Sequence, residues 1–338
     1  MRQVLLILVL LVSCIPSGLD AQSVPTPALL IAEKRGNHFA LADPTTLTVV
    51  GRVPASPTPH EVATDGTVAY LSTQTGGTIT AIDLATMKPL PGIDVGAIGV
   101  VHGLAVHGGK LYFTSERART VARYDPVTRR IDWLFGGGQV RTHLVVLTAD
   151  GSKIFTTNIG SGTLSIIERV EPAPAGAGRG GGRGGQAAPD WTITAVPAGA
   201  GAEGLALSPD EKTVWTANVP AHSLSVIDVA TKTLIDTIPL TTTYSNRLAF
   251  TPDGRHVLVA DLRGPEVLVF DAATRKEVRR IQIGGGTEGL LIAPDGSRAF
   301  ASAPSLNKVV VIDLKTFEIA GEIGGLEGPD GLAWLGPR

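Results

Sequence analysis

The stretch EGLALSPDEKTVWTAN, residues 203–218, returns later in the chain as EGLLIAPDGSRAFAS, residues 288–302. Four similar stretches bring the number of copies to six, and they cover residues 59–73, 101–115, 142–158, 203–218, 246–261 and 288–302. An apolar segment that ends in an acidic residue follows each copy, at Asp83, Asp125, Glu168, Asp228, Asp271 and Asp313. Most of these acidic residues lie 42 or 43 positions apart, a period typical of repeat units of four strands.

Each copy consists of short blocks rich in Val, Ile, Leu and Thr, separated by turn signals such as Pro-Asp-Gly and Asp-x-x-Thr. Proline presets the turn, aspartate hydrogen-bonds to nearby backbone N–H groups, and glycine takes the left-handed position. We therefore interpret the regular acidic residues as turn formers, and each repeat as four antiparallel strands. A four-stranded sheet repeated around an axis is a propeller blade.

The two chain ends complete the pattern. Residues 29–53 read as the second, third and fourth strands of a blade, with the third strand ending at Asp43, and residues 329–336 read as a first strand. Joined, they form a seventh blade that closes the ring and leaves no strand edge free for aggregation. The sequence thus predicts an all-β fold, a single seven-bladed β-propeller over residues 27–338 with a composite closing blade.

One spacing in the series is 60 residues, between Glu168 and Asp228. It contains the Gly/Ala/Pro-rich segment 171–190, which has little to pack and is predicted to be a disordered loop between a third and a fourth strand. The loop spells the dinucleotide pattern Gly-x-Gly-x-x-Gly at 176–181, but no βαβ unit surrounds it. Its two arginines are too few to indicate a nucleic-acid site.

The N-terminus has an apolar run from Val4 to Val12 after a single Arg2. The run is short for a membrane span and typical of a secretory signal, so we predict a signal peptide over 1–21 and export to the periplasm or outside the cell. Cys14, the only cysteine, follows Leu-Val-Ser as in a bacterial lipobox. Lipidation at Cys14, giving an outer-membrane lipoprotein, is the alternative, and in either case the chain forms no internal disulfide.

The composition excludes few functions. The chain has 29 basic and 31 acidic residues, so no bulk attraction to nucleic acid or to anionic membranes is expected. The motifs Gly-x-Ser-x-Gly, His-Glu-x-x-His and Cys-x-x-Cys-His are absent from the sequence. Nothing in it therefore indicates a serine hydrolase, a zinc protease or covalently attached haem.

The repeats resemble those of the YVTN-repeat β-propellers, of the YncE-like kind. The resemblance is strongest at Ser208-Pro209-Asp210, at residues 214–218 and at residues 225–231, and weaker echoes lie in every other blade. It implies a seven-bladed fold in the superfamily of lactonases and quinoprotein amine dehydrogenase β-chain-like propellers. That superfamily contains binding proteins, surface-layer proteins and enzymes, so the resemblance implies a fold rather than an activity.

The first strand of a propeller blade lines the central channel, so the residue just before it is expected at the channel mouth. That position is polar in all seven blades: His60, His102, His143, Glu203, Asn246, Glu288 and Asp330. The loops that follow the second strands open on the same face and add further polar residues: Glu33, Gln74, Glu116, Asn158, Asn218 and Asp261. The other histidines, His38, His107, His222 and His256, fall near turns or strand ends and are expected to be structural or solvated.

Three interpretations of the mouth stay open. It is a polar, water-filled channel, a site for a small organic ligand, or a site for a divalent transition metal held by His60, His102 and His143. The leading functional hypothesis is an exported, monomeric, non-catalytic protein that binds a small molecule or a cell-envelope protein at the mouth. The alternatives are a metal-dependent or lactonase-like enzyme with Glu203 or Glu288 as base, and a structural surface protein.

Overall fold

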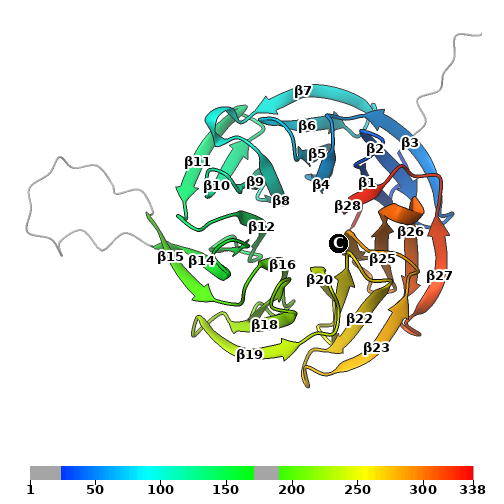
Figure 1. The fold of residues 1–338 in the computed structure, drawn as a ribbon. Helices are drawn as coiled ribbons and strands as arrows, with labels where there is room; N and C mark the ends of the chain where they lie inside the picture. The colour runs from blue at the N-terminus through cyan, green and yellow to red at the C-terminus, as the bar shows by residue number, and fades with distance from the viewer. Residues whose placement is uncertain (1–23, 171–189, 338) are drawn as a thin grey trace, which may run out of the picture.

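A computed structural model describes residues 24–170 and 190–337 as a ring of seven four-stranded antiparallel sheets around a central channel (Figure 1). The predicted all-β, seven-bladed β-propeller is therefore confirmed. In each blade the strand that is first in the repeat lies innermost, and the others follow outward. Two short 3-10 helices, η1 (Gly96–Ile98) and η2 (Pro304–Leu306), interrupt loops.

The strands follow the repeat closely. Blade 1 contains β28 (Pro329–Leu335), β1 (Ala28–Glu33), β2 (His38–Asp43) and β3 (Thr48–Pro54). Blade 2 contains β4 (Pro59–Thr64), β5 (Val68–Thr73), β6 (Thr78–Asp83) and β7 (Lys88–Asp94), and blade 3 contains β8 (Val101–His107), β9 (Lys110–Ser115), β10 (Thr120–Asp125) and β11 (Arg130–Gly136). Blade 4 contains β12 (Thr142–Leu147), β13 (Lys153–Asn158), β14 (Thr163–Val170) and β15 (Asp190–Pro197).

Blade 5 contains β16 (Ala202–Leu207), β17 (Thr213–Asn218), β18 (Ser223–Asp228) and β19 (Thr233–Pro239). Blade 6 contains β20 (Ser245–Phe250), β21 (His256–Asp261), β22 (Glu266–Asp271) and β23 (Glu277–Gln282). Blade 7 contains β24 (Gly289–Ile292), β25 (Arg298–Ala303), β26 (Lys308–Asp313) and β27 (Glu318–Ile323). The large buried side chains Phe39, Phe113, Phe155, Trp215 and Phe300 come from second and third strands.

Two predicted segments lie wholly or almost wholly outside the described residues. The signal peptide 1–21, with Cys14, is one of them, and the loop 171–190 is described only at Asp190. The place of the loop is as predicted, because β14 ends at Val170 and β15 begins at Asp190, so it joins the third and fourth strands of blade 4. No helix among the described residues is long and apolar enough to cross a membrane.

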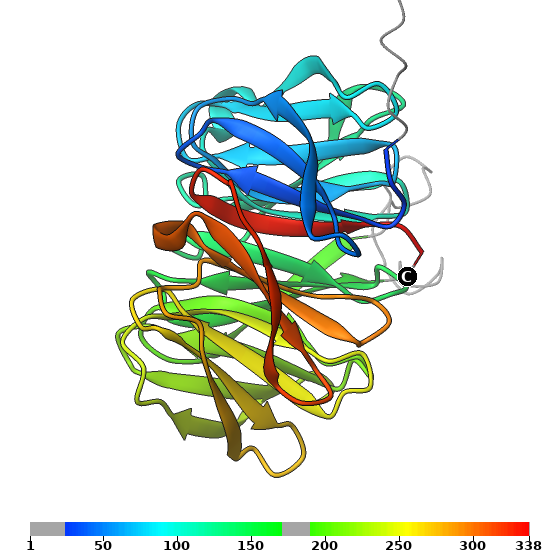
Figure 2. The ribbon, with the colours of Figure 1, turned by 90° about the vertical axis from the view of Figure 1, so that its right-hand side faces the viewer.

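The two chain ends close the ring as predicted. Strand β28 pairs antiparallel with β1, with Leu29 opposite Trp334 and Ile31 opposite Leu332, and Figure 2 shows the red C-terminal strand beside the blue N-terminal one. An ion pair with a buried carboxylate supports this closure: Arg52 Nε and Nη2 donate to the Glu33 carboxylate at 2.6 and 2.9 Å. The same carboxylate accepts a hydrogen bond from the backbone N–H of Glu327 at 2.8 Å.

The regular aspartates form turns, as the sequence predicted. Asp228 Oδ1 accepts hydrogen bonds from the backbone N–H and the hydroxyl of Thr231, at 2.7 and 2.8 Å. These bonds favour the charged carboxylate and lower the pKa of Asp228. The same arrangement recurs at Asp83, Asp271 and Asp313. Glu168 differs, because its carboxylate pairs with the ammonium groups of Lys153 and Lys232.

Neighbouring inner strands approach so closely that several of them contain glycine at the contact. A Cβ on Gly103 would lie 2.7 Å from the carbonyl oxygen of His143 and 2.9 Å from Leu144 Cα, both backbone atoms of the next blade. Three further inner strands have glycine at the same place, directly after the predicted mouth residue: Gly204, Gly289 and Gly331. The diameter of the channel is therefore set by backbone packed against backbone.

Replacing Gly103 with Ala should force blades 3 and 4 apart. The free energy of unfolding, measured by urea titration, should fall by about 1–3 kcal/mol, the usual cost of overpacking. Gly136→Ala is the control, since a Cβ there would meet no atom within 4 Å. Equal stability of the two variants would contradict the close approach.

Candidate functional site

The predicted mouth residues sit in bulges of the inner strands. The prediction placed each of them directly before its inner strand. Six of them are instead the second residue of that strand, and only Glu288 directly precedes its strand, β24. The pairing of β8 with β9 jumps from Val101 to Leu104, so that His102 and Gly103 are left out of the ladder. Comparable shifts occur at the mouth residues of β4, β12, β16, β20 and β28. A bulge re-aims its side chains, here toward the channel.

Hydroxyl groups of second strands hold the bulges in place. Thr114 Oγ1 accepts a hydrogen bond from the backbone N–H of Gly103 at 2.9 Å and donates one to the carbonyl oxygen of His143 in the next blade. Thr157 Oγ1 accepts from Leu144 N at 3.3 Å and donates to the carbonyl oxygen of Glu203 at 2.8 Å. The bulges of blades 3 and 4 are thus each fixed relative to the bulge of the following blade.

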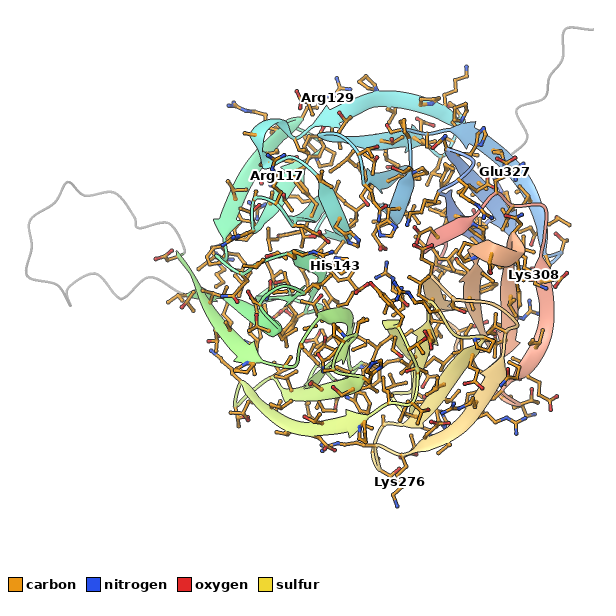
Figure 3. All side chains as sticks on the ribbon, in the orientation of Figure 1. Arg117, Arg129, His143, Lys276, Lys308 and Glu327 are labelled. Carbon is orange, nitrogen blue, oxygen red and sulfur yellow. The ribbon has the colours of Figure 1, made fainter. Side chains whose placement is uncertain are left out.

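The three predicted histidines lie side by side in consecutive blades, and Figure 3 labels His143 near the channel. His60 Nε2 lies 2.7 Å from His102 Nε2, and the His102 and His143 ring centroids are 3.6 Å apart. Potential metal ligands within 4.8 Å of one another form the groups His60–Glu61–His102, His102–Glu116–His143 and His60–Glu288–Asp330. None of these groups of described residues contains all three histidines, so they form a row rather than one convergent triad.

Carboxylates orient both ends of this row. His60 Nδ1 is hydrogen-bonded to the carboxylate of Asp330, which also lies 3.1 Å from Lys34 Nζ. Lys34 Nζ in turn donates to Glu288 Oε1 at 2.6 Å. At the other end, His143 Nδ1 lies 2.6 Å from Glu116 Oε1. With their Nδ1 atoms engaged, the two outer histidines keep Nε2 for contacts within the site.

The pKa shifts differ along the row. Burial lowers the pKa of His102 well below its ordinary value, and repulsion from any positive charge on the His143 and His60 rings acts in the same direction. Burial also acts to lower the pKa of His60, but the charge and hydrogen bond of Asp330 outweigh it, so the pKa of His60 is raised. Of the three rings, His60 is therefore the one that most favours an added proton.

An ion pair crosses the channel beside the histidines. Arg247 Nη2 donates to Glu61 Oε1, and their side chains are only 10% and 16% exposed. The two residues come from β20 and β4, which face each other across the channel in Figure 1. Glu61 and Arg247 directly follow a mouth residue, at a position that is glycine in four other blades. Two opposite charges at a position that is otherwise mostly glycine were a sequence signal for this ion pair, and the sequence analysis did not use it. It also missed Lys34.

The residues predicted in the loops after the second strands lie at the mouth end of the blades, as expected, but most of their side chains do not contact the histidine row. Glu116 does contact His143, but Gln74 is exposed and Glu33 binds Arg52. Asp261 accepts hydrogen bonds from the backbone of residues 243, 244 and 263. Asn158 and Asn218 donate to Ser or Thr side chains of the next strand. Such short polar side chains bond within their own hairpin or its flanking loops before they can reach the channel axis.

The mouth is packed rather than open. Apart from the intermediate Glu288, its predicted residues are at most 9% exposed, which contradicts a water-filled channel at this level. Three of their polar atoms, His102 Nδ1, Asn246 Oδ1 and Asp330 Oδ1, are buried without a hydrogen-bond partner among the described residues. A cavity of about 490 Å³ lies instead toward the other end of the inner strands, lined by mainly apolar residues such as Leu104, Leu147 and Leu332. His107 lies at that end, as expected.

Removing the Arg247 cation should destabilise the ring. Arg247→Met leaves the Glu61 carboxylate buried without its partner, and the free energy of unfolding in urea should fall by about 3–5 kcal/mol. The double variant Glu61→Gln/Arg247→Met should recover part of that loss, whereas Arg279→Met, at an exposed arginine of β23, should change stability by less than about 0.5 kcal/mol. A loss no larger than that of Arg279→Met would argue against a buried pair across the channel.

No protein-family model and no curated protein matches the chain. Solved structures do match it. A functionally unknown protein from Desulfotomaculum acetoxidans DSM 771 is 12% identical with a TM-score of 0.76, covering 93% of this chain and 100% of that one. A protein from Bacteroides uniformis ATCC 8492, provisionally assigned as a 6-phosphogluconolactonase, is 17% identical with a TM-score of 0.71, covering 92% and 100%.

A third similar structure is the dihydro-heme d1 dehydrogenase NirN in complex with DHE. It is 18% identical with a TM-score of 0.63, and the match covers 93% of this chain and 67% of that one. Proteins with such different descriptions share the architecture at identities below one fifth. The comparisons therefore identify the chain as a seven-bladed β-propeller, and its activity has to be inferred from its own site.

Proposed function

We propose that this chain is a non-catalytic binding protein that holds a small cation at the polar end of its channel. The observation that carries the proposal is an excess of buried and half-buried carboxylates around the histidine row. Five carboxylates gather there: Glu61, Glu116, Glu203, Glu288 and Asp330. Three permanently charged cations oppose them: Lys34, Arg141 and Arg247.

The remaining imbalance favours a cationic ligand. The carboxylates outnumber these cations by two. Charge in a weakly solvated site is costly unless opposite charge balances it, so the folded protein gains free energy when a cation enters. The low exposure of the mouth residues supports an ion or another very small cation rather than a sugar or a lactone. The unpartnered oxygens of Asn246 and Asp330 are further acceptors for it.

The resemblance of the repeats to YVTN-repeat, YncE-like propellers is compatible with a binding role. That superfamily contains binding proteins as well as surface-layer proteins and enzymes, and we extend the binding role to this chain. A cation bound at the mouth would alter the charge that the face presents to a cell-envelope protein. In this proposal a cell-envelope protein binds the face only after the cation has bound.

Cation binding should raise thermal stability. We expect at least one cation from a panel of magnesium, calcium, manganese, zinc, choline and spermidine to raise the melting temperature, since a ligand at 100 times its Kd stabilises by about 2.7 kcal/mol. Glu288→Gln, which removes one mouth charge, should weaken this effect. Glu318→Gln, on the exposed outer strand β27, should leave it unchanged. No stabilisation by any cation, or equal stabilisation of both variants, would refute the proposal.

The alternative is an enzyme at the same place. Glu203 Oε1 lies 3.9 Å from His143 Nε2, so a carboxylate and an imidazole are available for proton transfer. The packed mouth leaves little space for a lactone, which is why we prefer binding. Turnover of a lactone panel with added divalent metal, lost in Glu203→Gln, would reverse this preference.

We further propose that the chain is exported. The apolar run Val4–Val12 supports this, with cleavage after residue 21 or lipidation of Cys14 as the two routes. Expression of the full chain in a bacterium should place it in the envelope or medium fraction, and mass spectrometry of its N-terminus should distinguish the routes. Cys14→Ser should release the protein from membranes if it is lipidated and change nothing if it is cleaved. Recovery of the uncleaved chain from the cytoplasm would contradict export.

A further inference from the structure

The ligand of the proposed cation site can be narrowed to one chemical class, an inference that rests on the proposed function. We propose that the cation is a divalent transition metal ion bound by His60 Nε2, His102 Nε2 and the Glu61 carboxylate, with Asp330 as a positioning residue. This set replaces the three-histidine set expected from the sequence, since His143 contacts Glu116 and does not share a group with His60.

The contact between the two Nε2 atoms is the central observation. Neutral imidazole has one nitrogen that donates and one that accepts, so two such nitrogens at 2.7 Å share one hydrogen between them. A divalent metal ion can take the place of that hydrogen, because it binds the lone pairs of both Nε2 atoms once His102 carries its hydrogen on Nδ1. It also adds positive charge to a site in which carboxylates outnumber cations.

The geometry requires only small shifts. Two nitrogens on one tetrahedral ion with bonds of about 2.0–2.1 Å lie about 3.3 Å apart, so His60 and His102 would separate by about 0.6 Å. Glu61 Oε1 lies 3.9 Å from His60 Nε2 and would approach by a similar amount. The guanidinium of Arg247 already orients that carboxylate. Two histidines and a glutamate leave a fourth position for water or another ligand.

Asp330 provides the outer support that metal-binding histidines usually have. A ligating imidazole commonly directs its other nitrogen to a carboxylate, which fixes the ring and raises its basicity. His60 does this through Nδ1 to Asp330, whose side chain is wholly buried and also close to Lys34. Asp330 contributes to binding by orienting His60, and Lys34 keeps the carboxylate in place.

The donor atoms select the class of ion. Imidazole nitrogen suits zinc, copper, nickel and iron, whereas magnesium and calcium prefer sites made of oxygen. A pair of imidazoles with one carboxylate is therefore expected to discriminate against the two abundant alkaline-earth ions. Stabilisation by zinc, cobalt or nickel but not by calcium is the corresponding signature.

The test is metal content and coordination of the tag-free mature protein. After incubation with zinc and dialysis, the wild type should retain about one equivalent, and His102→Gln should retain none. His107→Gln is the matched control, because that histidine lies toward the other end of the inner strand and should leave zinc binding unchanged. Asp330→Asn should raise the zinc Kd about 10- to 100-fold, as loss of a supporting carboxylate does.

A second measurement needs no variant and covers the case in which His102→Gln fails to fold. X-ray absorption fine structure of the zinc-loaded wild type should show two imidazole ligands at about 2.0 Å. Fewer than two imidazoles, or zinc retention that His102→Gln does not change, would overturn the inference. Stabilisation by spermidine or calcium without retention of zinc would overturn it too and leave cation binding intact. Absence of any cation effect would remove both proposals.

Discussion

The pairing of β28 with β1 is the contact on which the rest of the structure depends. The other six blades are continuous in sequence, but the ring closes only when the last strand joins the first three. The buried carboxylate of Glu33, bound by Arg52 and by the backbone of Glu327, ties the same two ends together. Closure leaves no inner strand edge free and fixes the channel radius. It also places Asp330, from the C-terminus, against His60.

A fixed radius explains the chemistry of the mouth. Glycines after the mouth residues let neighbouring backbones approach, and bulges turn the mouth side chains inward. Imidazoles and carboxylates that water would otherwise separate are thereby packed together. Burial lowers the pKa of His102, whereas the charge and hydrogen bond of Asp330 outweigh burial and raise the pKa of His60. Opposite charges at Glu61 and Arg247 then meet across the channel. The same packing that holds the ring together therefore gathers more carboxylates than cations around the histidine row.

Part of the site could be read directly from the repeat. Once a period of 42 or 43 residues is recognised, the residue at one place in each blade must recur around the axis, so His60, His102 and His143 were expected to be neighbours. The positions of these residues along their strands were harder to predict. The bulges, which depend on hydrogen bonds such as those of Thr114, decided that the mouth residues lie within their strands. The polar residues predicted after the second strands lie at the mouth end, but the side chains of Asp261 and Asn158 bond within their hairpins or the flanking loops instead of contacting the histidines.

The sequence by itself determined the all-β class, the seven blades, the composite closing blade and the turn role of the aspartates. These features depend on local turn chemistry and on a sequence repeat that recurs in each blade. Only the tertiary structure decided which polar groups are in contact. The contacts at the channel join residues that are far apart in the sequence, such as Glu61 with Arg247 and His60 with Asp330. The distances between these groups and their burial depend on the radius of the closed ring. The packing of all seven blades sets that radius, so it cannot be predicted from the sequence of any single repeat.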